Sequence, residues 1–236
     1  MILDAGTGIR NVGIDIAKSG YGPRDDFLLV FSHTHWDHIQ GFPFFAPAYD
    51  PKRRFTLVFP KRSGYAKSLH DIFSAQMQAE YFPVPLDKMR SDIQFLAPEA
   101  VRRTWGHGGT ATIREHNHPG GAYGYRVEEG DKTMVYCTDI EHGDDLDPKV
   151  ISLSKDADLL IHDAQYSDDE LEMKKGWGHS SWNQAMAVAE QAGVKNLVLT
   201  HHDPDHDDAF LQQVEKECQS RFPNAVLARE GMEITV

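Results

Sequence analysis

The chain has 236 residues, of which 40% are hydrophobic and 25% charged, as in an ordinary globular protein with a sizeable core. It contains no apolar stretch long enough to span a membrane and no recognisable signal peptide. The formal net charge of −12 disfavours partners that need a broad basic surface, although bound metal ions reverse the local field for a small anionic ligand. Two isolated cysteines, Cys137 and Cys218, fit a reducing compartment, so we expect a cytoplasmic protein.

The first part of the chain leads into a cluster of metal-binding side chains. Met1 to Gly8 is typical of a strand end followed by a glycine-rich turn. The apolar run over residues 27–32 predicts a buried strand. Within six residues of its end lie four side chains that can bind a transition metal: His33, His35, Asp37 and His38.

The spacing of these four side chains favours metal chemistry over a histidine-rich surface loop. Imidazole and carboxylate ligands suit Zn²⁺ and neighbouring first-row metals. His33 and His35 alternate and can face one way, whereas Asp37 and His38 must turn toward a different point. The arrangement therefore fits two adjacent ions better than one.

The middle of the chain predicts one helix and several short strands. After a strand at 55–59, apolar residues at helical spacing over 65–78 indicate a helix with one buried stripe. Tyr81–Leu86 contains two prolines and two aromatic residues, and it fits a substrate wall, a dimer contact or a rigid loop that covers the core. Further strands are expected at 93–96, 111–114, 124–127 and 133–137.

Polar residues follow four of the apolar strands directly, those at 27–32, 133–137, 159–162 and 197–200. The last three lead into Asp139, Asp163 and His201. Ligands at the carboxyl ends of strands are the usual geometry of an α/β active site. Ser181-x-x-Gln184 predicts a capped helix that ends at Gly193, and residues 232–236 predict a closing strand. We find no internal repeat or long linker and expect a single domain over residues 1–236.

The segment from Phe31 to His38 resembles the signature of the metallo-β-lactamase fold hydrolases, in the Asp-His variant that builds a dinuclear site. Glu115 to Gly121 is similar to the third metal motif of the ribonuclease Z and phosphodiesterase branch. Stretches beginning at Asp4, Tyr81, His162 and Gly176 resemble the phosphodiesterases that destroy cyclic nucleotide signals. The resemblance covers nearly the whole chain and implies a mixed α/β (α+β) fold, the αββα sandwich. Family members carry further strands before Asp4, so we expect a truncated start or a trimmed sheet.

The resemblance also implies a ligand set for two divalent ions, zinc or alternatively manganese. The implied ligands are His33, His35, Asp37, His38, His118, Asp139 and His201. His118 is preferred to His116, Asp139 matches the carboxylate that bridges the two ions, and Asp4 is expected to orient a ligand or to cap a turn.

A further pair, Asp163 and His179, matches a carboxylate and a Gly-His-Ser histidine of the ribonuclease Z branch, which usually has Glu in place of Asp. A carboxylate partner raises the basicity of a histidine and fixes its tautomer. The implied catalytic residues are then Asp37, His179 and Asp163, with His179 as general acid. The alternative for the pair is a polar cluster that caps a helix.

These residues predict a hydrolase, and the fold alone does not decide its substrate. We expect a dinuclear phosphodiesterase in which metal-bound hydroxide attacks a small anionic phosphodiester such as a cyclic nucleotide. Ribonuclease Z, a tRNA 3′-end endonuclease, is the nearest alternative, but its members carry a long arm between the third-motif histidine and the bridging aspartate. Here His118 and Asp139 are only 21 positions apart (139 minus 118).

With the acidic net charge, this short separation leads us to expect no large nucleic acid partner. We also expect no membrane partner, and a homodimer. Hydrolysis of a carboxyl ester, lactone or thioester is a second alternative. A metal-dependent sensor or scaffold domain without catalysis is a third.

Overall fold

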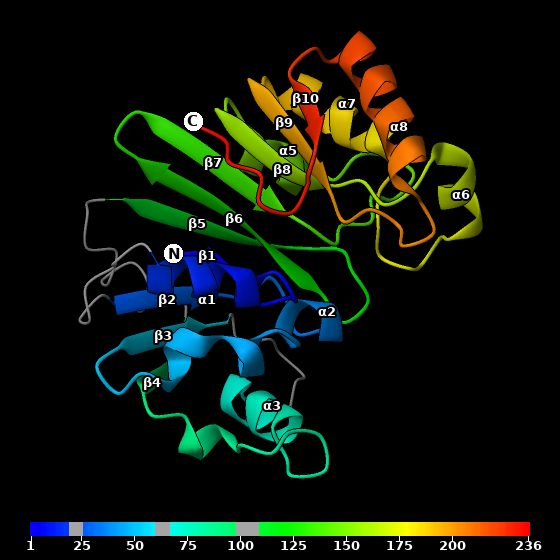
Figure 1. Cartoon of the computed structure of the whole chain (residues 1–236). Helices are drawn as coiled ribbons and strands as arrows, with labels where there is room; N and C mark the ends of the chain where they lie inside the picture. The colour runs from blue at the N-terminus through cyan, green and yellow to red at the C-terminus, as the bar shows by residue number, and fades with distance from the viewer. Residues whose placement is uncertain (19–25, 60–66, 98–108) are drawn as a thin grey trace. The chain divides into compact units, whose positions relative to one another are not determined.

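The computed structural model describes residues 1–18, 26–59, 67–97 and 109–236. The chain divides into two compact units, Met1–Thr104 and Trp105–Val236, and each contains its own β-sheet (Figure 1). That the two units belong to one hydrolase domain stays a prediction. In the described ranges, none of the helices is long and apolar enough to cross a bilayer.

The first unit is built on a four-stranded sheet in the order β1-β2-β3-β4, with every pair parallel. Its strands are β1 (Ile2–Leu3), β2 (Asp26–Val30), β3 (Arg54–Val58) and β4 (Asp92–Leu96). Its helices are α1 (Ile9–Lys18), α2 (Trp36–Ile39), α3 (Leu69–Gln76) and the 3₁₀ turns η1 (Phe42–Phe44), η2 (Ala46–Tyr49) and η3 (Leu86–Lys88). Leucine and phenylalanine side chains from strands and helices share one core, and burial of this apolar surface stabilises the unit.

Local signals set the bounds of α3. The Ser68 hydroxyl accepts from the Asp71 amide, and the Asp71 carboxylate accepts from the Ser68 amide, which makes a capping box. The helix therefore begins at Leu69 rather than at the predicted residue 65, which lies outside the described residues. Helix α1 was not predicted from the sequence.

The second unit is built on a six-stranded sheet in the order β10-β9-β8-β7-β6-β5. Its strands are β5 (Thr110–His116), β6 (Ala122–Glu129), β7 (Lys132–Cys137), β8 (Leu159–Asp163), β9 (Asn196–Thr200) and β10 (Ala225–Leu227). Strands β7 to β10 are parallel, and β5, β6 and β7 pair antiparallel. Helices α5 (Pro148–Ser154), α7 (Trp182–Ala192) and α8 (Asp208–Arg221) pack on this sheet, and α6 (Asp168–Met173) precedes α7 along the chain (Figure 1).

The C-terminal part of the second unit confirms one prediction and corrects another. The predicted capping box of Ser181 and Gln184 starts helix α7, and Gly193 caps its C-terminal end with a φ of 69°, which suits a residue without a Cβ atom. The predicted strand at 232–236 is wrong. The sheet ends instead in β10, because Ala225 and Leu227 are buried in the core and pair with β9, whereas Met232 and Ile234 are exposed.

Candidate active site

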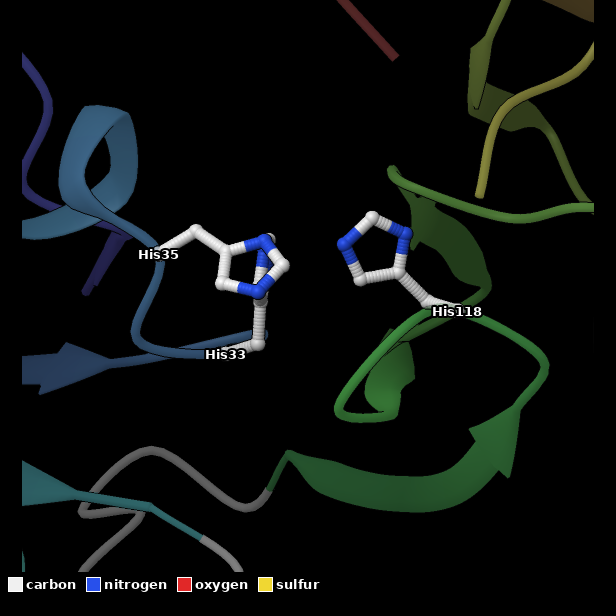
Figure 2. Close-up of side chains that lie close together, drawn as sticks. All are labelled: His33, His35 and His118. Carbon is white, nitrogen blue, oxygen red and sulfur yellow. The ribbon is translucent and has the colours of Figure 1, made fainter. Parts of the chain in front are cut away.

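In the first unit, the predicted ligands follow β2 directly. The rings of His33 and His35 lie with centroids 4.5 Å apart, and those of His33 and His38 lie 4.1 Å apart. Figure 2 shows His33 and His35 leaving the loop after β2, and His118 leaving the loop after β5 in the second unit. Asp37 and His38 lie on the single turn of α2. Helix α2 begins at Trp36, directly after His35. This turn of the chain brings Asp37 and His38 back toward His33 and His35.

Asp4 orients this cluster from the neighbouring strand end. Because β1 and β2 are parallel, Asp4 lies beside Ser32. Its carboxylate accepts from the Ser32 amide and hydroxyl, each at 2.7 Å, and lies 2.9 Å from His38 Nδ1. The predicted contact between Asp4 and a metal-ligand candidate is thus present.

The donor set of this cluster fits a metal ion. With Nδ1 of His38 donating to Asp4, the lone pair of that imidazole is on Nε2. This nitrogen lies 3.1 Å from Asp37 Oδ2. Two acceptor atoms at this distance attract each other only when a cation or a proton lies between them.

In the second unit, the predicted residues gather at the carboxyl ends of parallel strands. Asp139 follows β7, Asp163 ends β8, and His201 follows β9. The ligand atoms of these three residues and His179 lie within 4.8 Å of one another. His201 Nε2 is 3.3 Å from Asp139 Oδ1, another close approach of a ring nitrogen and a carboxylate that suits a shared cation.

Backbone conformation marks the same residues. Four described residues other than glycine have a positive φ, and three of them are Asp4, Asp139 and His201, with φ of 59°, 54° and 64°. The left-handed conformation is costly for residues with a Cβ atom, by about 1–2 kcal/mol each. Such strain concentrates at functional sites, where the surrounding structure maintains it.

Asp163 and His179 form a pair beside Asp139. His179 Nδ1 lies 2.8 Å from Asp163 Oδ2, and Asp163 is fully buried. The same carboxylate accepts from the amides of Asp139 at 3.1 Å and of Ser180 at 2.8 Å. The shorter Asp side chain therefore reaches the histidine where the resembled branch usually has Glu. With Nδ1 held by Asp163, Nε2 is the nitrogen that exchanges a proton with a ligand.

The two histidines after β5 occupy different environments. His118 Nδ1 lies 2.8 Å from the Gly178 carbonyl oxygen, and its ring centroid is 5.4 Å from that of His179. His116 instead points into the interior, where its Nε2 lies 3.0 Å from the Thr138 carbonyl oxygen. The structure thus places His118, and not His116, beside His179.

A group of buried histidines beside this site was not predicted. The His142 ring stacks on that of His162 with centroids 5.4 Å apart. Its Nδ1 accepts from the Asp147 amide at 3.0 Å. Burial, and secondarily repulsion from His162 and His116, lowers the pKa of His142 to about 3. His142 is therefore neutral in the folded protein near neutral pH.

The neutral state of His142 predicts a loss of stability in acid. In the unfolded chain this histidine takes up a proton below about pH 6.5, and in the folded protein only near pH 3. The free energy of unfolding should therefore fall with decreasing pH in this window, at up to ~1.4 kcal/mol per pH unit. His142→Asn keeps an acceptor for the Asp147 amide and does not titrate, so it should flatten the dependence measured by urea unfolding. His70 is exposed, so His70→Asn should leave the pH dependence unchanged. Equal pH dependence of the free energy of unfolding in the wild type and both variants would contradict the prediction.

Comparison with known families identifies the chain. Residues 2–202 match the family described as the β-lactamase superfamily domain. The chain belongs to this family. Ribonuclease Z of Haloarcula marismortui is 26% identical in an alignment 274 residues long, gaps included. The alignment covers 99% of this chain and 86% of that protein. Ribonuclease Z of Prochlorococcus marinus strain NATL2A is 36% identical over a shorter stretch of 107 residues, 44% of this chain and 33% of its own length.

Solved structures share the fold. The metallo-β-lactamase fold protein YhfI of Bacillus subtilis has a TM-score of 0.66 at 24% identity, and it matches 98% of this chain and 84% of its own. The short form of human tRNase Z has a TM-score of 0.67 at 19% identity and matches 99% of this chain and 86% of its own. The chain is a metal-dependent hydrolase of the metallo-β-lactamase fold, in the ribonuclease Z-like branch.

The expectation that this protein has no large nucleic acid partner is wrong. The relative that matches 99% of the chain is a ribonuclease, and a neighbour in fold is named for its action on tRNA. Net charge was a poor guide, because binding of a phosphate backbone depends on the local field. Bound cations can reverse the sign of that field within an acidic protein.

Proposed function

We propose that this protein cleaves a phosphodiester bond in RNA, as a ribonuclease Z-like endonuclease that acts at tRNA 3′ ends. The similarity to ribonuclease Z along 99% of the chain carries the proposal. The pair of His179 and Asp163 supports it, because it provides a proton donor beside metal-ligand candidates at one edge of the six-stranded sheet.

The proposed metal ligands are those that the sequence predicts. They are His33, His35, Asp37, His38, His118, Asp139 and His201. When bound, two divalent ions, zinc in our proposal, supply hydroxide near neutral pH and neutralise charge on the attacked phosphate. Asp139 is proposed to contact both ions, because its two carboxylate oxygens can each bind one.

His179 is proposed to donate the proton that the leaving group needs. As hydroxide adds to phosphorus, the bond from phosphorus to the ribose oxygen breaks, and that oxygen accepts the proton from His179 Nε2. Asp163 holds Nδ1 at 2.8 Å and stabilises the imidazolium that exists before the transfer. Its remaining bonds to backbone amides keep the carboxylate in place.

A small phosphodiester such as a cyclic nucleotide is a second candidate substrate, favoured by one observation. The residues between His118 and Asp139 form the antiparallel strands β6 and β7, joined at Gly130 and Asp131. A protruding arm like that of the resembled tRNA endonucleases has no room in this segment.

A substrate panel tests both candidates. The zinc-loaded protein should cleave precursor tRNA at the 3′ end of the mature tRNA sequence. Asp139→Ala protein purified in the same way is the control for contaminating nucleases. Cyclic mononucleotides, bis-p-nitrophenyl phosphate and a lactone complete the panel. Rapid cleavage of a cyclic nucleotide with intact precursor tRNA would reject the first candidate in favour of the second, and hydrolysis of the lactone alone would reject both.

A further inference from the structure

Glu141 lies two residues after Asp139 and is not among the predicted site residues. Its two carboxylate oxygens accept from the backbone amides of Gly176 and Gly178, each at 2.7 Å. Hydrogen bonds to an ionised acceptor are about twice as strong as those between neutral groups. One carboxylate therefore holds both ends of the turn Gly176–Gly178, called here the 176–178 turn.

The conformation of the 176–178 turn requires support. Gly176 and Gly178 have φ of 86° and 95°, values that only glycine adopts without strain. Between them, Trp177 is 58% exposed, so burial of its side chain does not anchor the turn. The Trp177 amide bonds to the nearby Lys174 carbonyl oxygen at 3.1 Å, whereas the Gly176 and Gly178 amides bond to Glu141, in a different part of the chain.

The 176–178 turn contacts His118 closely. Gly178 provides the carbonyl oxygen that lies 2.8 Å from His118 Nδ1. A Cβ atom at Gly178 would lie 2.2 Å from the same nitrogen, so the backbone approaches the imidazole as near as glycine allows. This contact makes Nδ1 the donor and leaves the lone pair on Nε2, the tautomer that a metal ligand needs.

Glu141 is itself fixed to the residue before His118. Its amide donates to the Asn117 carbonyl oxygen at 2.9 Å, and its carbonyl oxygen accepts from Asn117 Nδ2 at 3.0 Å. Hydrogen bonds thus run in a closed ring from Asn117 through Glu141 and the 176–178 turn to His118. Removal of the Glu141 carboxylate opens this ring on the side of the turn.

We propose that Glu141 is a positioning residue that acts through the 176–178 turn on His118 and His179. The turn positions the Gly178 carbonyl oxygen beside His118 Nδ1. It also fixes the backbone directly before His179, which is the next residue in the chain. Asp163 holds the far side of that segment through His179 and the Ser180 amide. The inference rests on the proposed function, in which His118 is a metal ligand and His179 a proton donor.

The expected effect is that of a residue that supports a metal ligand without contacting the metal itself. Loss of such a partner typically lowers metal affinity or activity ~10–100-fold. Glu141→Ala should lower zinc affinity by that order, measured by competition with a chelator. In ¹H–¹⁵N spectra the amide resonances of Gly176 and Gly178 should shift upfield as the charged acceptor disappears. The loss of activity should appear in kcat rather than in KM.

Two further variants sharpen the test. Glu141→Gln keeps the side-chain shape but offers one acceptor oxygen, and its amide donor faces the second glycine N–H. Its effects should therefore lie between those of Glu141→Ala and the wild type. Glu172→Ala removes a neighbouring exposed carboxylate that pairs with Lys175 at 2.8 Å. It should leave zinc affinity and both glycine resonances unchanged.

The zinc and spectroscopic measurements need no substrate, so they judge Glu141 separately from the proposed reaction. If the wild type cleaves no phosphodiester but Glu141→Ala still weakens zinc binding and shifts both glycine resonances, the proposed function fails and the positioning role stands. Wild-type zinc affinity and unshifted glycine resonances in Glu141→Ala would overturn the inference. If that variant does not fold, the same result in Glu141→Gln would overturn it.

Discussion

His179→Ala should lower kcat by ~10²–10⁴-fold on a substrate with an alkoxide leaving group, the usual contribution of general acid–base catalysis. The fold and the bound zinc should remain, because His179 is proposed to hold a proton and not a metal ion. The measurement is steady-state kinetics on precursor tRNA or a dinucleotide, with zinc content determined in the same samples.

The choice of leaving group distinguishes a proton donor from other roles. p-Nitrophenolate departs without protonation, so the loss on bis-p-nitrophenyl phosphate should be much smaller. His206 pairs with Glu170 at 2.9 Å and is not among the proposed site residues, so His206→Ala serves as a matched control that should keep wild-type kcat. Equal losses on both substrates would show that His179 is not the proton donor.

Asp163→Asn should lower kcat in the same direction, but less than His179→Ala. The imidazole remains in this variant, but it loses the carboxylate that accepts from Nδ1 at 2.8 Å and fixes the ring. The buried carboxylate also accepts from the backbone amides of Asp139, Gln165 and Ser180, so thermal unfolding must confirm that the variant is folded. A larger loss than that of His179→Ala in a folded sample would assign Asp163 a role beyond supporting the histidine.

Asp139→Ala should remove metal from both proposed positions and abolish activity. Only this carboxylate is proposed to contact both ions, so its loss should weaken both together. Elemental analysis of wild-type protein after full loading should give two ions per chain, and the variant should hold fewer than one under the same conditions.

A matched control distinguishes the effect of losing the Asp139 carboxylate from the effect of placing alanine in a strained backbone conformation. Asp156 has the same φ of 54° as Asp139 and lies outside the site, so Asp156→Ala carries a similar conformational penalty. This control should keep both ions and full activity. A single ion in the loaded wild type would reject the dinuclear proposal, and loss of only one ion in Asp139→Ala would reject the bridging role.

Local patterns in the sequence predicted most of the elements that carry the site. The apolar runs before His33, Asp139, Asp163 and His201 all form strands, because short β-branched and aliphatic runs are stable when buried in a parallel sheet. The capping box at Ser181 predicted the start of α7 for an equally local reason. The closing strand was misplaced, because alternation at 232–236 cannot show which segment pairs with β9.

Local sequence was enough to predict which metal-binding and catalytic residue types are present and that they follow strand ends. His33, His35, Asp37 and His38 are adjacent in the chain, so their grouping needs no tertiary information. The choice of His118 over His116 came from resemblance to a family motif, and the structure gives it a physical reason. A shift of two residues moves a side chain from the interior beside Thr138 to the Gly178 carbonyl oxygen.

The polar groups that support the site could not be predicted from local sequence and are seen in the folded structure. Glu141 follows a strand like many surface glutamates, and nothing near it in the sequence points to Gly176 and Gly178, 35 and 37 positions away. The burial that keeps His142 neutral likewise depends on packing against β8. Contacts between segments far apart in the chain arise when the sheet forms, so the roles of Glu141 and His142 follow from the fold and not from the local sequence.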